Sequence, residues 1–95
     1  MSKAKLWKIF SEYIRLRDSD NRGYCRCIYC DRVHNYKDIH AGHFIPKNKG
    51  WSIYFDEQNV NSQCAYCNLM LHGNQYAYGK AINDKYGKSV ADKLI

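Results

Sequence analysis

The chain has almost no proline and no long run of hydrophobic residues. Its single proline is Pro46, and no stretch approaches the ~18 to 20 consecutive apolar residues of a membrane-spanning helix. The first ten residues, MSKAKLWKIF, are basic but contain neither an apolar core nor a small-residue cleavage site, unlike a signal peptide. Internal repeats and low-complexity segments are also missing. We therefore expect a cytosolic protein, without a membrane partner, whose cysteines stay reduced or bind metal.

The length and charge of the chain narrow the choice of fold and partner. Its 95 residues suit one small domain, which we expect to span residues 1–95. A domain of this size buries a modest part of its surface, so a stabilising metal or disulfide bonds are expected. Lys and Arg number 15 against 9 Asp and Glu, a net charge of +6. This surplus favours a polyanionic partner, nucleic acid first, although lysine can also serve solubility alone.

Helices are expected at both ends of the chain. Near the start, the apolar residues at helical spacing are Leu6, Trp7, Phe10, Tyr13 and Ile14, which places an N-terminal helix at 3–19. The last part, 74–95, reads as a helical segment, with a helix over 74–87 and a shorter one near the end.

The middle of the chain predicts short strands and one more helix. Residues 37–46 read as a strand that Pro46 must end, because proline cannot donate to a strand ladder. A second short strand is expected at 53–55, followed by an irregular stretch over 56–63. Residues 64–73 read as a helix whose first turn carries two cysteines.

Four of the five cysteines form two CxxC pairs, Cys27 with Cys30 and Cys64 with Cys67. Each pair can place two thiolates on one side of a tight turn, within reach of a tetrahedral zinc ion at ~2.3 Å. The short spacing argues against disulfides in a reducing compartment, so we predict a structural Zn²⁺ site. Cys25 could pair with Cys30 instead, but the spacing of Cys27 repeats in the second pair. We therefore expect Cys25 to be a packed or partly exposed thiol.

The segment between the two pairs is longer than a zinc finger needs. Thirty-three residues separate Cys30 from Cys64, whereas a finger or ribbon usually has about 12 to 20 there. The extra length fits two strands and a loop, and it contains His40 and His43. Zinc would hold the base of this hairpin against the helix that carries the second pair. The expected fold is a small α+β zinc-bound domain.

The motifs CIYC, AGHFIP, DEQNV and CAYCN together resemble the HNH, or ββα-metal, nuclease fold. The order of FSEYIRLRD, HAGHFIP and FDEQNVNSQCAYCN is similar to that of the phage lambda NinG (Rap) recombination protein family, over residues 6 to 87. The resemblance implies a zinc-framed ββα core at 24–73, flanked by the N-terminal helix and the C-terminal helices.

The same resemblance implies an activity. We expect a metal-dependent endonuclease that cuts branched or single-strand-containing DNA during phage recombination, in the cytoplasm of the bacterial host. A non-catalytic, zinc-stabilised module that binds nucleic acid is the alternative. A homodimer, formed through the N-terminal or C-terminal helix, is compatible with either.

Three residues match the functional positions of that family. His43 matches the general base, and the ordinary pKa of imidazole suits proton transfer near neutral pH. Asn68, directly after Cys67, matches a ligand of the catalytic divalent cation, Mg²⁺ or Mn²⁺ with Zn²⁺ as a further option. Asn59 matches the middle asparagine, which ties the loop to the strand and orients the base.

One position departs from the family pattern. Many members have an acidic residue or a histidine just before the base as the second metal ligand, but Gly42 cannot ligate. We favour His72, one helical turn after Asn68, as its replacement. His40 is the second candidate, although strand alternation puts it and His43 on opposite faces. Two acidic residues are outside candidates, Asp56 and Glu57.

Basic side chains are expected to neutralise DNA phosphates around the strand-end histidine. The candidates are Lys47, Lys49 and Arg32, with Arg15, Arg17 and Lys37 as further ones. Trp51 and Tyr54 could stack on unpaired bases, but we favour packing in the core for both. We also expect packing for three other tyrosines, Tyr66, Tyr76 and Tyr78.

Overall fold

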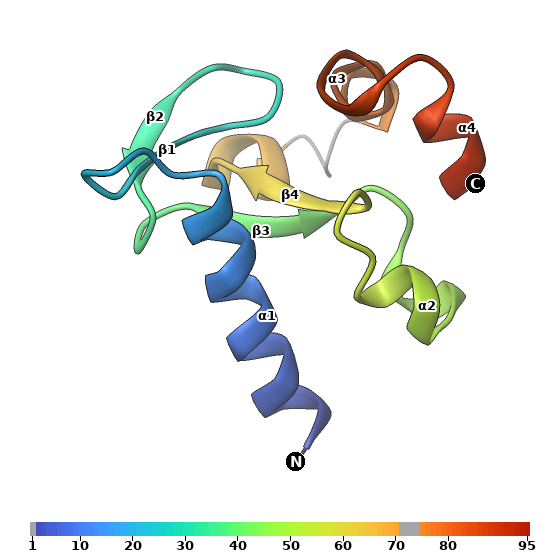
Figure 1. The fold of residues 1–95 in the computed structure, drawn as a ribbon, viewed down its shortest axis with the longest axis horizontal. Helices are drawn as coiled ribbons and strands as arrows, with labels where there is room; N and C mark the ends of the chain where they lie inside the picture. Colours follow the sequence, from blue (N-terminus) through green and yellow to red (C-terminus); the bar gives the residue numbers. More distant parts are fainter. Residues whose placement is uncertain (1, 71–74) are drawn as a thin grey trace.

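The computed structural model describes residues 2–70 and 75–95, except for the side chains of Lys47, Leu69 and Met70. It is a small α+β domain (Figure 1). The elements follow in the order α1 (Lys3–Arg17), β1 (Tyr24–Arg26), β2 (Val33–Asn35), β3 (His40–His43), η1 (Lys47–Lys49), α2 (Trp51–Tyr54), β4 (Val60–Gln63), η2 (Tyr66–Met70), α3 (Gln75–Tyr86) and α4 (Val90–Leu94).

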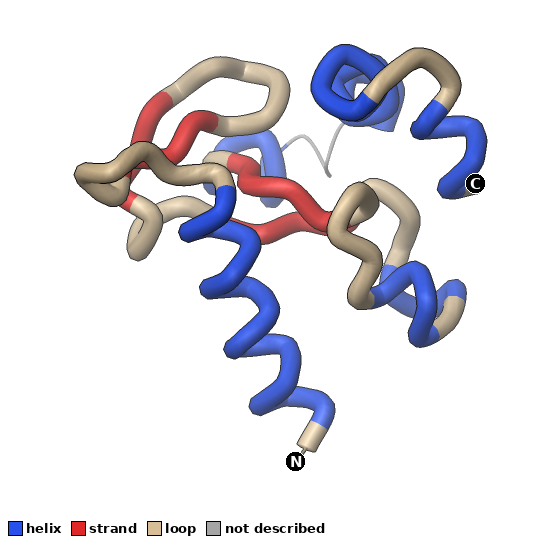
Figure 2. The backbone as a smooth tube through the Cα atoms, in the orientation of Figure 1, coloured by secondary structure: helices blue, strands red, loops and turns tan. Residues whose placement is uncertain are grey.

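Two antiparallel strand pairs organise the middle of the chain (Figure 2). β1 pairs with β2, and β3 pairs with β4. The register of the second pair runs from His40 opposite Gln63 to His43 opposite Val60. A backbone hydrogen bond from Ile28 to Ser62, 2.9 Å long, links the first pair to the second. The β3–β4 ladder is therefore the centre to which the other elements attach.

Helix α1 packs against this ladder with one narrow side. Ser2 caps the helix by accepting a hydrogen bond from the Lys5 backbone N–H. Ile14 is fully buried. The expected apolar stripe is wrong at its edges, because Leu6 and Tyr13 are 40% and 48% exposed. The ladder is only two strands wide, so it cannot cover a broad helix face.

The buried residues form two clusters. One gathers cysteines and Ile39 around the loop between β1 and β2. The other joins Phe44 to α3 and α4 through Tyr78, Ile82 and Ala91. Within the described part of the chain, no helix combines the length and apolarity needed to cross a bilayer.

The expected elements are partly confirmed. The N-terminal helix and both C-terminal helices are present, and β3 ends before Pro46. The strand expected at 53–55 is wrong, because those apolar residues lie at the end of α2 and just after it. The irregular stretch expected at 56–63 is also wrong, because it contains β4. All four residues of β4 are buried, so its sequence shows no apolar–polar alternation to read.

Candidate functional site

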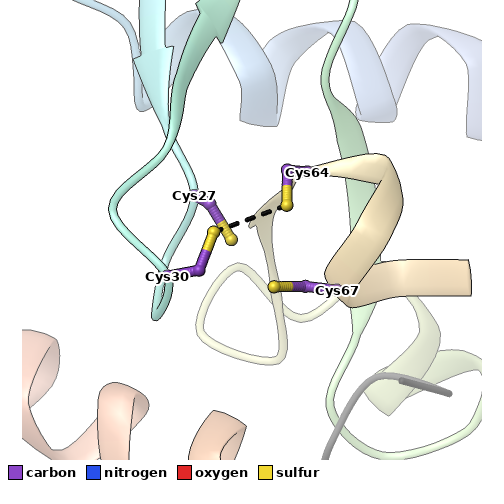
Figure 3. Close-up of side chains that lie close together, drawn as sticks. All are labelled: Cys27, Cys30, Cys64 and Cys67. Atoms are coloured by element: carbon purple, nitrogen blue, oxygen red, sulfur yellow. Dashed lines mark hydrogen bonds between the residues drawn. The ribbon is translucent and has the colours of Figure 1, made fainter. Parts of the chain in front are cut away.

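The four CxxC cysteines converge on one point (Figure 3). Cys27 and Cys30 lie at the turn after β1, and Cys64 and Cys67 lie where the chain leaves β4 and enters η2. Their sulfur atoms all lie within 4.8 Å of one another, and those of Cys30 and Cys64 are 3.4 Å apart. Tetrahedral coordination at ~2.3 Å places sulfurs about 3.8 Å apart. None of the five thiols forms a disulfide, so this cluster could hold a zinc ion.

The thiols of the cluster differ in how readily they ionise. Burial raises the pKa of Cys30 and of Cys67. Burial also opposes ionisation of Cys64, but the Cys67 backbone N–H and the neighbouring thiols lower its pKa to about 7. Cys64 is therefore the thiol that most readily offers a thiolate to an incoming cation.

Cys25 lies outside the cluster, as expected from the repeated spacing. It sits in β1 opposite His34 and is fully buried, and burial raises its pKa. Of the two expected environments, packed or partly exposed, Cys25 has the packed one.

A second group of candidate residues lines a cleft of about 390 Å³ at the end of β3. We call it the His43 cleft, and its walls are Trp7, Ala41, Gly42, His43, Pro46 and Asn68. A larger hollow of about 880 Å³ lies between the loop after β1 and α3. Its lining mixes acidic and basic side chains, and none of the described residues in it is a histidine, so the His43 cleft is the better candidate for chemistry.

The ring of His43 is held from two sides. Its Nε2 lies 3.0 Å from the carbonyl oxygen of Tyr54. A carbonyl only accepts, so Nε2 carries a proton, and in the neutral ring the lone pair is then on Nδ1. The ring also stacks on Trp7, with centroids 4.8 Å apart and planes at 23°. The orientation and the tautomer of this histidine are therefore both set by its neighbours.

Asn59 holds the loop that supplies the Tyr54 carbonyl. It is fully buried. Its Oδ1 accepts from the Ile45 backbone N–H at 2.7 Å. Its Nδ2 donates to the carbonyls of Ile45 and Ile53, at 3.2 and 3.0 Å. These hydrogen bonds fasten α2 to the end of β3, and so they fix the acceptor of His43.

Asn68 lies in the π-helical turn η2, one residue after Cys67. Its Nδ2 lies 3.0 Å from Nδ1 of His40. An amide nitrogen only donates, so His40 accepts with Nδ1 and orients Asn68. This contact favours a positioning role for His40 over direct ligation through that nitrogen. The other ligand candidate, His72, lies outside the described residues.

The sequence alone does not identify Gln63 or Tyr78 as part of the site, but the structure places both near the cleft. Gln63 is fully buried, and its Oε1 has no hydrogen-bond partner among the described residues. A Cβ added to Gly42 would lie 1.7 Å from that oxygen and 2.9 Å from Oδ1 of Asn68. Tyr78 was expected only to pack, yet its hydroxyl donates to the Gly42 carbonyl and accepts from the Asn61 N–H at 3.0 Å.

The acidic candidates are engaged away from the cleft. Asp56 accepts from the backbone N–H groups of Gln58 and Asn59, at 2.8 and 3.1 Å. Glu57 accepts from the Tyr13 hydroxyl at 2.5 Å. Neither residue lines the His43 cleft.

The basic candidates divide into two groups. Arg15 donates to the Tyr36 carbonyl at 2.7 Å, and Arg17 donates to Asp18, Glu57, Val60 and Asn61. Both guanidinium groups therefore serve contacts inside the protein. The exposed group comprises Arg32, Lys37 and Lys49, whereas the Lys47 side chain lies outside the described part.

The two aromatic candidates of α2 behave differently. Tyr54 is 6% exposed, which confirms packing, but Trp51 is 61% exposed, so the expectation of packing is wrong for it. A cation that the sequence pattern does not single out, Lys3, has its Nζ 5.0 Å from the centroid of the Trp51 ring and 4.5 Å from that of Tyr54. Trp51 and Lys3 therefore offer an exposed aromatic and a positive charge together.

The family model described as Bacteriophage Lambda NinG protein matches residues 2–95. The match includes both cysteine pairs, the β3–β4 ladder and the helices at each end. No curated protein and no solved structure matches the chain.

Proposed function

We propose, from the premise that this chain belongs to the bacteriophage lambda NinG family, that it is a metal-dependent DNA endonuclease of the HNH, or ββα-metal, type. Its proposed substrates are branched or single-strand-containing intermediates of phage recombination. The proposed ββα core consists of β3, β4 and the helical turn η2. The observation that carries the proposal is the set tautomer of His43 at the wall of a cleft that also contains Asn68.

His43 acts as the general base in this proposal. Its Nδ1 takes a proton from a water molecule while the water oxygen bonds to phosphorus. The bond from phosphorus to the leaving sugar oxygen then breaks, and that oxygen is protonated from solvent. Trp7 stacks on the ring and stabilises it once it is positively charged. A positioned base of this kind contributes about 10²- to 10⁴-fold in rate.

Asn68 is the proposed ligand of a divalent cation, Mg²⁺ or Mn²⁺. A bound ion of this type polarises the phosphate and stabilises the leaving oxygen. Such hard cations prefer oxygen ligands, and the amide oxygen of Asn68 lies on the side of Gly42, because its nitrogen donates to His40. This oxygen is of the type that such an ion binds, and it would supply one of the several oxygen ligands that the ion requires.

The four-cysteine cluster is proposed to hold a structural Zn²⁺. Its four thiolates would complete a closed tetrahedral site without an open position for substrate. Cys67 directly precedes Asn68, so the zinc fixes the turn that presents the amide to the cleft. This role is positional and involves no step of the reaction.

DNA contact is proposed for the exposed basic residues and not for the two engaged arginines. Lys49 follows β3 in η1, and Lys3 lies over the aromatic rings of α2. These charges can neutralise phosphates, and the exposed ring of Trp51 can stack on an unpaired base. Such stacking would favour branched substrates over intact duplex.

A second candidate function rests on one specific observation. Among the described residues, none that lines the His43 cleft carries a carboxylate, although carboxylates are the usual protein ligands of Mg²⁺. This favours a non-catalytic zinc module that binds nucleic acid. Cleavage assays separate the two functions.

The test compares wild type with His43→Ala on plasmid and branched DNA, in Mg²⁺ and in Mn²⁺. We expect the variant to retain zinc and DNA binding but to lose at least about 100-fold in cleavage rate. His34→Ala is the matched control, because His34 lies in β2, away from the cleft. If wild type binds DNA but cuts it with neither ion, the binding module is correct. Normal cleavage by His43→Ala would show that another residue is the base.

A further inference from the structure

Two side-chain oxygens converge on the space beside Gly42. Oε1 of Gln63 lies 1.7 Å, and Oδ1 of Asn68 lies 2.9 Å, from the point where a Cβ on residue 42 would stand. The backbone of Gly42 does not need glycine for its conformation, since its φ is not positive. Glycine is needed for space, because the amide of Gln63 occupies the place of the absent side chain.

The strand register explains how Gln63 reaches this position. Gln63 is opposite His40, and Gly42 lies two residues further along the same strand. Diagonal neighbours of this kind face the same side of the sheet and lie within reach of long side chains. The amide therefore extends across the ladder toward Gly42.

The orientation of the amide is set by Tyr29. Nε2 of Gln63 donates to the Tyr29 hydroxyl at 3.2 Å, and this hydroxyl also lies 3.4 Å from the Cys67 carbonyl oxygen, to which it donates. The oxygen of Gln63 must then point the other way, toward Gly42. It is buried there without a partner among the described residues, and an unpaired buried oxygen is unfavourable unless something binds it.

We propose that Gln63 supplies, from across the β3–β4 ladder, the second oxygen ligand of the divalent-cation site that Asn68 begins. The catalytic role of this ion rests on the proposed function. Gln63 would replace the metal ligand that glycine at position 42 cannot provide. A cation bound by both amide oxygens satisfies the unpaired Oε1. His40 and Tyr29 orient the two amides by occupying their nitrogens.

The chemistry of two neutral amides has a consequence for affinity. Tight sites for hard cations use several charged ligands, whereas this pair brings no charge. The ion therefore binds weakly to the protein alone and more tightly when DNA adds a phosphate oxygen. Replacing Gln63 by glutamate adds a charge without a change in length, so it strengthens binding.

The test is a titration with Mn²⁺, followed by the electron paramagnetic resonance signal of the free ion. It uses the full chain with its zinc content measured, with and without uncleavable branched DNA. We expect Gln63→Met, which keeps the volume but removes the oxygen, to weaken binding roughly 10- to 100-fold. We expect Gln63→Glu to strengthen it. Ser62→Ala, a change at the neighbouring buried residue of β4, should leave the affinity for Mn²⁺ unchanged.

Moving the oxygen-bearing side chain from position 63 to position 42 makes the test specific. A carboxylate at position 42 collides with Gln63, so Gly42→Asp alone should be destabilised. Gly42→Asp combined with Gln63→Ala removes the collision with Gln63, leaves a close contact that a small shift of the Asn68 side chain relieves, and returns an oxygen to the same space. The double variant should therefore recover Mn²⁺ binding that the single variant Gln63→Ala has lost.

The outcomes separate this inference from the proposed function. Unchanged Mn²⁺ affinity in Gln63→Met overturns the inference, as does the lack of any Mn²⁺ binding by wild type with or without DNA. If Gln63→Met fails to fold, Gln63→Glu decides, and an unchanged affinity there overturns the inference as well. Mn²⁺ binding that depends on Gln63, without DNA cleavage, supports the ion site and refutes the endonuclease. DNA cleavage by a protein whose Mn²⁺ affinity does not depend on Gln63 supports the endonuclease and refutes the ion site at Gln63.

Discussion

The four-cysteine cluster lies at one end of the β3–β4 ladder and the His43 cleft extends along β3 to the other end, but the two sites are built in opposite ways. The cluster begins one residue after Gln63, at the end where His40 pairs. The cleft runs from Ala41 to His43, which pairs with Val60 at the other end, and Asn68, the residue after Cys67, forms one of its walls. Two short turns supply all four sulfurs of the cluster. The cleft takes its walls from α1, from β3 and the residues after it, and from η2.

Because they are built differently, the cluster and the cleft are stabilised by different interactions. A metal ion can hold the cluster directly, through bonds much stronger than packing contacts. The cleft is held by hydrogen bonds to backbone groups and by stacked rings, such as those of Asn59, Tyr78 and Trp7. Loss of a cysteine ligand should therefore unfold both the cluster and the cleft, whereas a substitution in the cleft should leave zinc bound to the cluster.

The largest expected effect comes from removing one zinc ligand. Structural zinc contributes about 10 to 16 kcal/mol in small zinc domains, and the net stability of a typical domain is only about 5 to 15 kcal/mol. Cys64→Ser should therefore unfold the protein, and a strong chelator should do the same to wild type. Far-UV circular dichroism and zinc content measure both.

Cys25→Ala is the matched control for this change. Cys25 is as buried as Cys27, Cys64 and Cys67 but lies outside the cluster, so the variant should stay folded with one zinc per chain. A Cys64→Ser protein that remained folded without metal would remove the basis of the comparison between the two ends.

An intermediate effect is expected at the cleft end. Tyr78→Phe leaves the Gly42 carbonyl and the Asn61 N–H without the hydroxyl that joins them. Unpaired buried groups cost about 1 to 3 kcal/mol each, so the loss of both partners should lower the free energy of unfolding by about 2 to 6 kcal/mol. Urea denaturation measures the loss, and the zinc content should not change. Loss of zinc from this variant would mean that the two ends are not independent.

The smallest effect is expected at Asp18, which joins α1 to β4 and α3. Its burial opposes ionisation, but hydrogen bonds from Arg17 and Lys85 hold its pKa below the usual value. Asp18 also accepts from the backbone N–H and hydroxyl of Ser62, at 3.1 and 2.9 Å. Asp18→Asn should lower the free energy of unfolding at pH 7 by about 1 kcal/mol, as measured in urea.

The sign of the pKa shift predicts how the two regions respond to acid. A carboxyl whose pKa is lower in the folded state stabilises that state fully at pH values above its unfolded pKa of about 3.9. This stabilisation is lost only as the pH falls through the pKa of the folded state. During acidification, thiolate ligands are protonated at a higher pH than Asp18 is, and they then release their metal. Wild type and Asp18→Asn should therefore share one acid-unfolding midpoint, set by zinc release. A clearly higher midpoint pH for Asp18→Asn would show that Asp18 sets it instead.

The residues that were predicted correctly are those whose partners lie nearby in the chain. The CxxC spacing selected Cys27 over Cys25, and the cluster contains Cys27. Helical periodicity located α1 and α3. The strand β4 was missed because four buried residues with three polar side chains show no period. Trp51 was misassigned because aromatic character alone does not reveal which face of a short helix meets solvent.

The sequence by itself determined the four-cysteine cluster and both terminal helices, because ligand spacing and helical periodicity are local properties of the chain. It also singled out His43, Asn59 and Asn68 through resemblance. Only the tertiary structure brought Trp7 onto His43 and the oxygen of Gln63 beside Gly42. Those contacts depend on the register of β3 against β4 and on the packing of α1. A one-residue slip of that register would turn Gln63 to the other face.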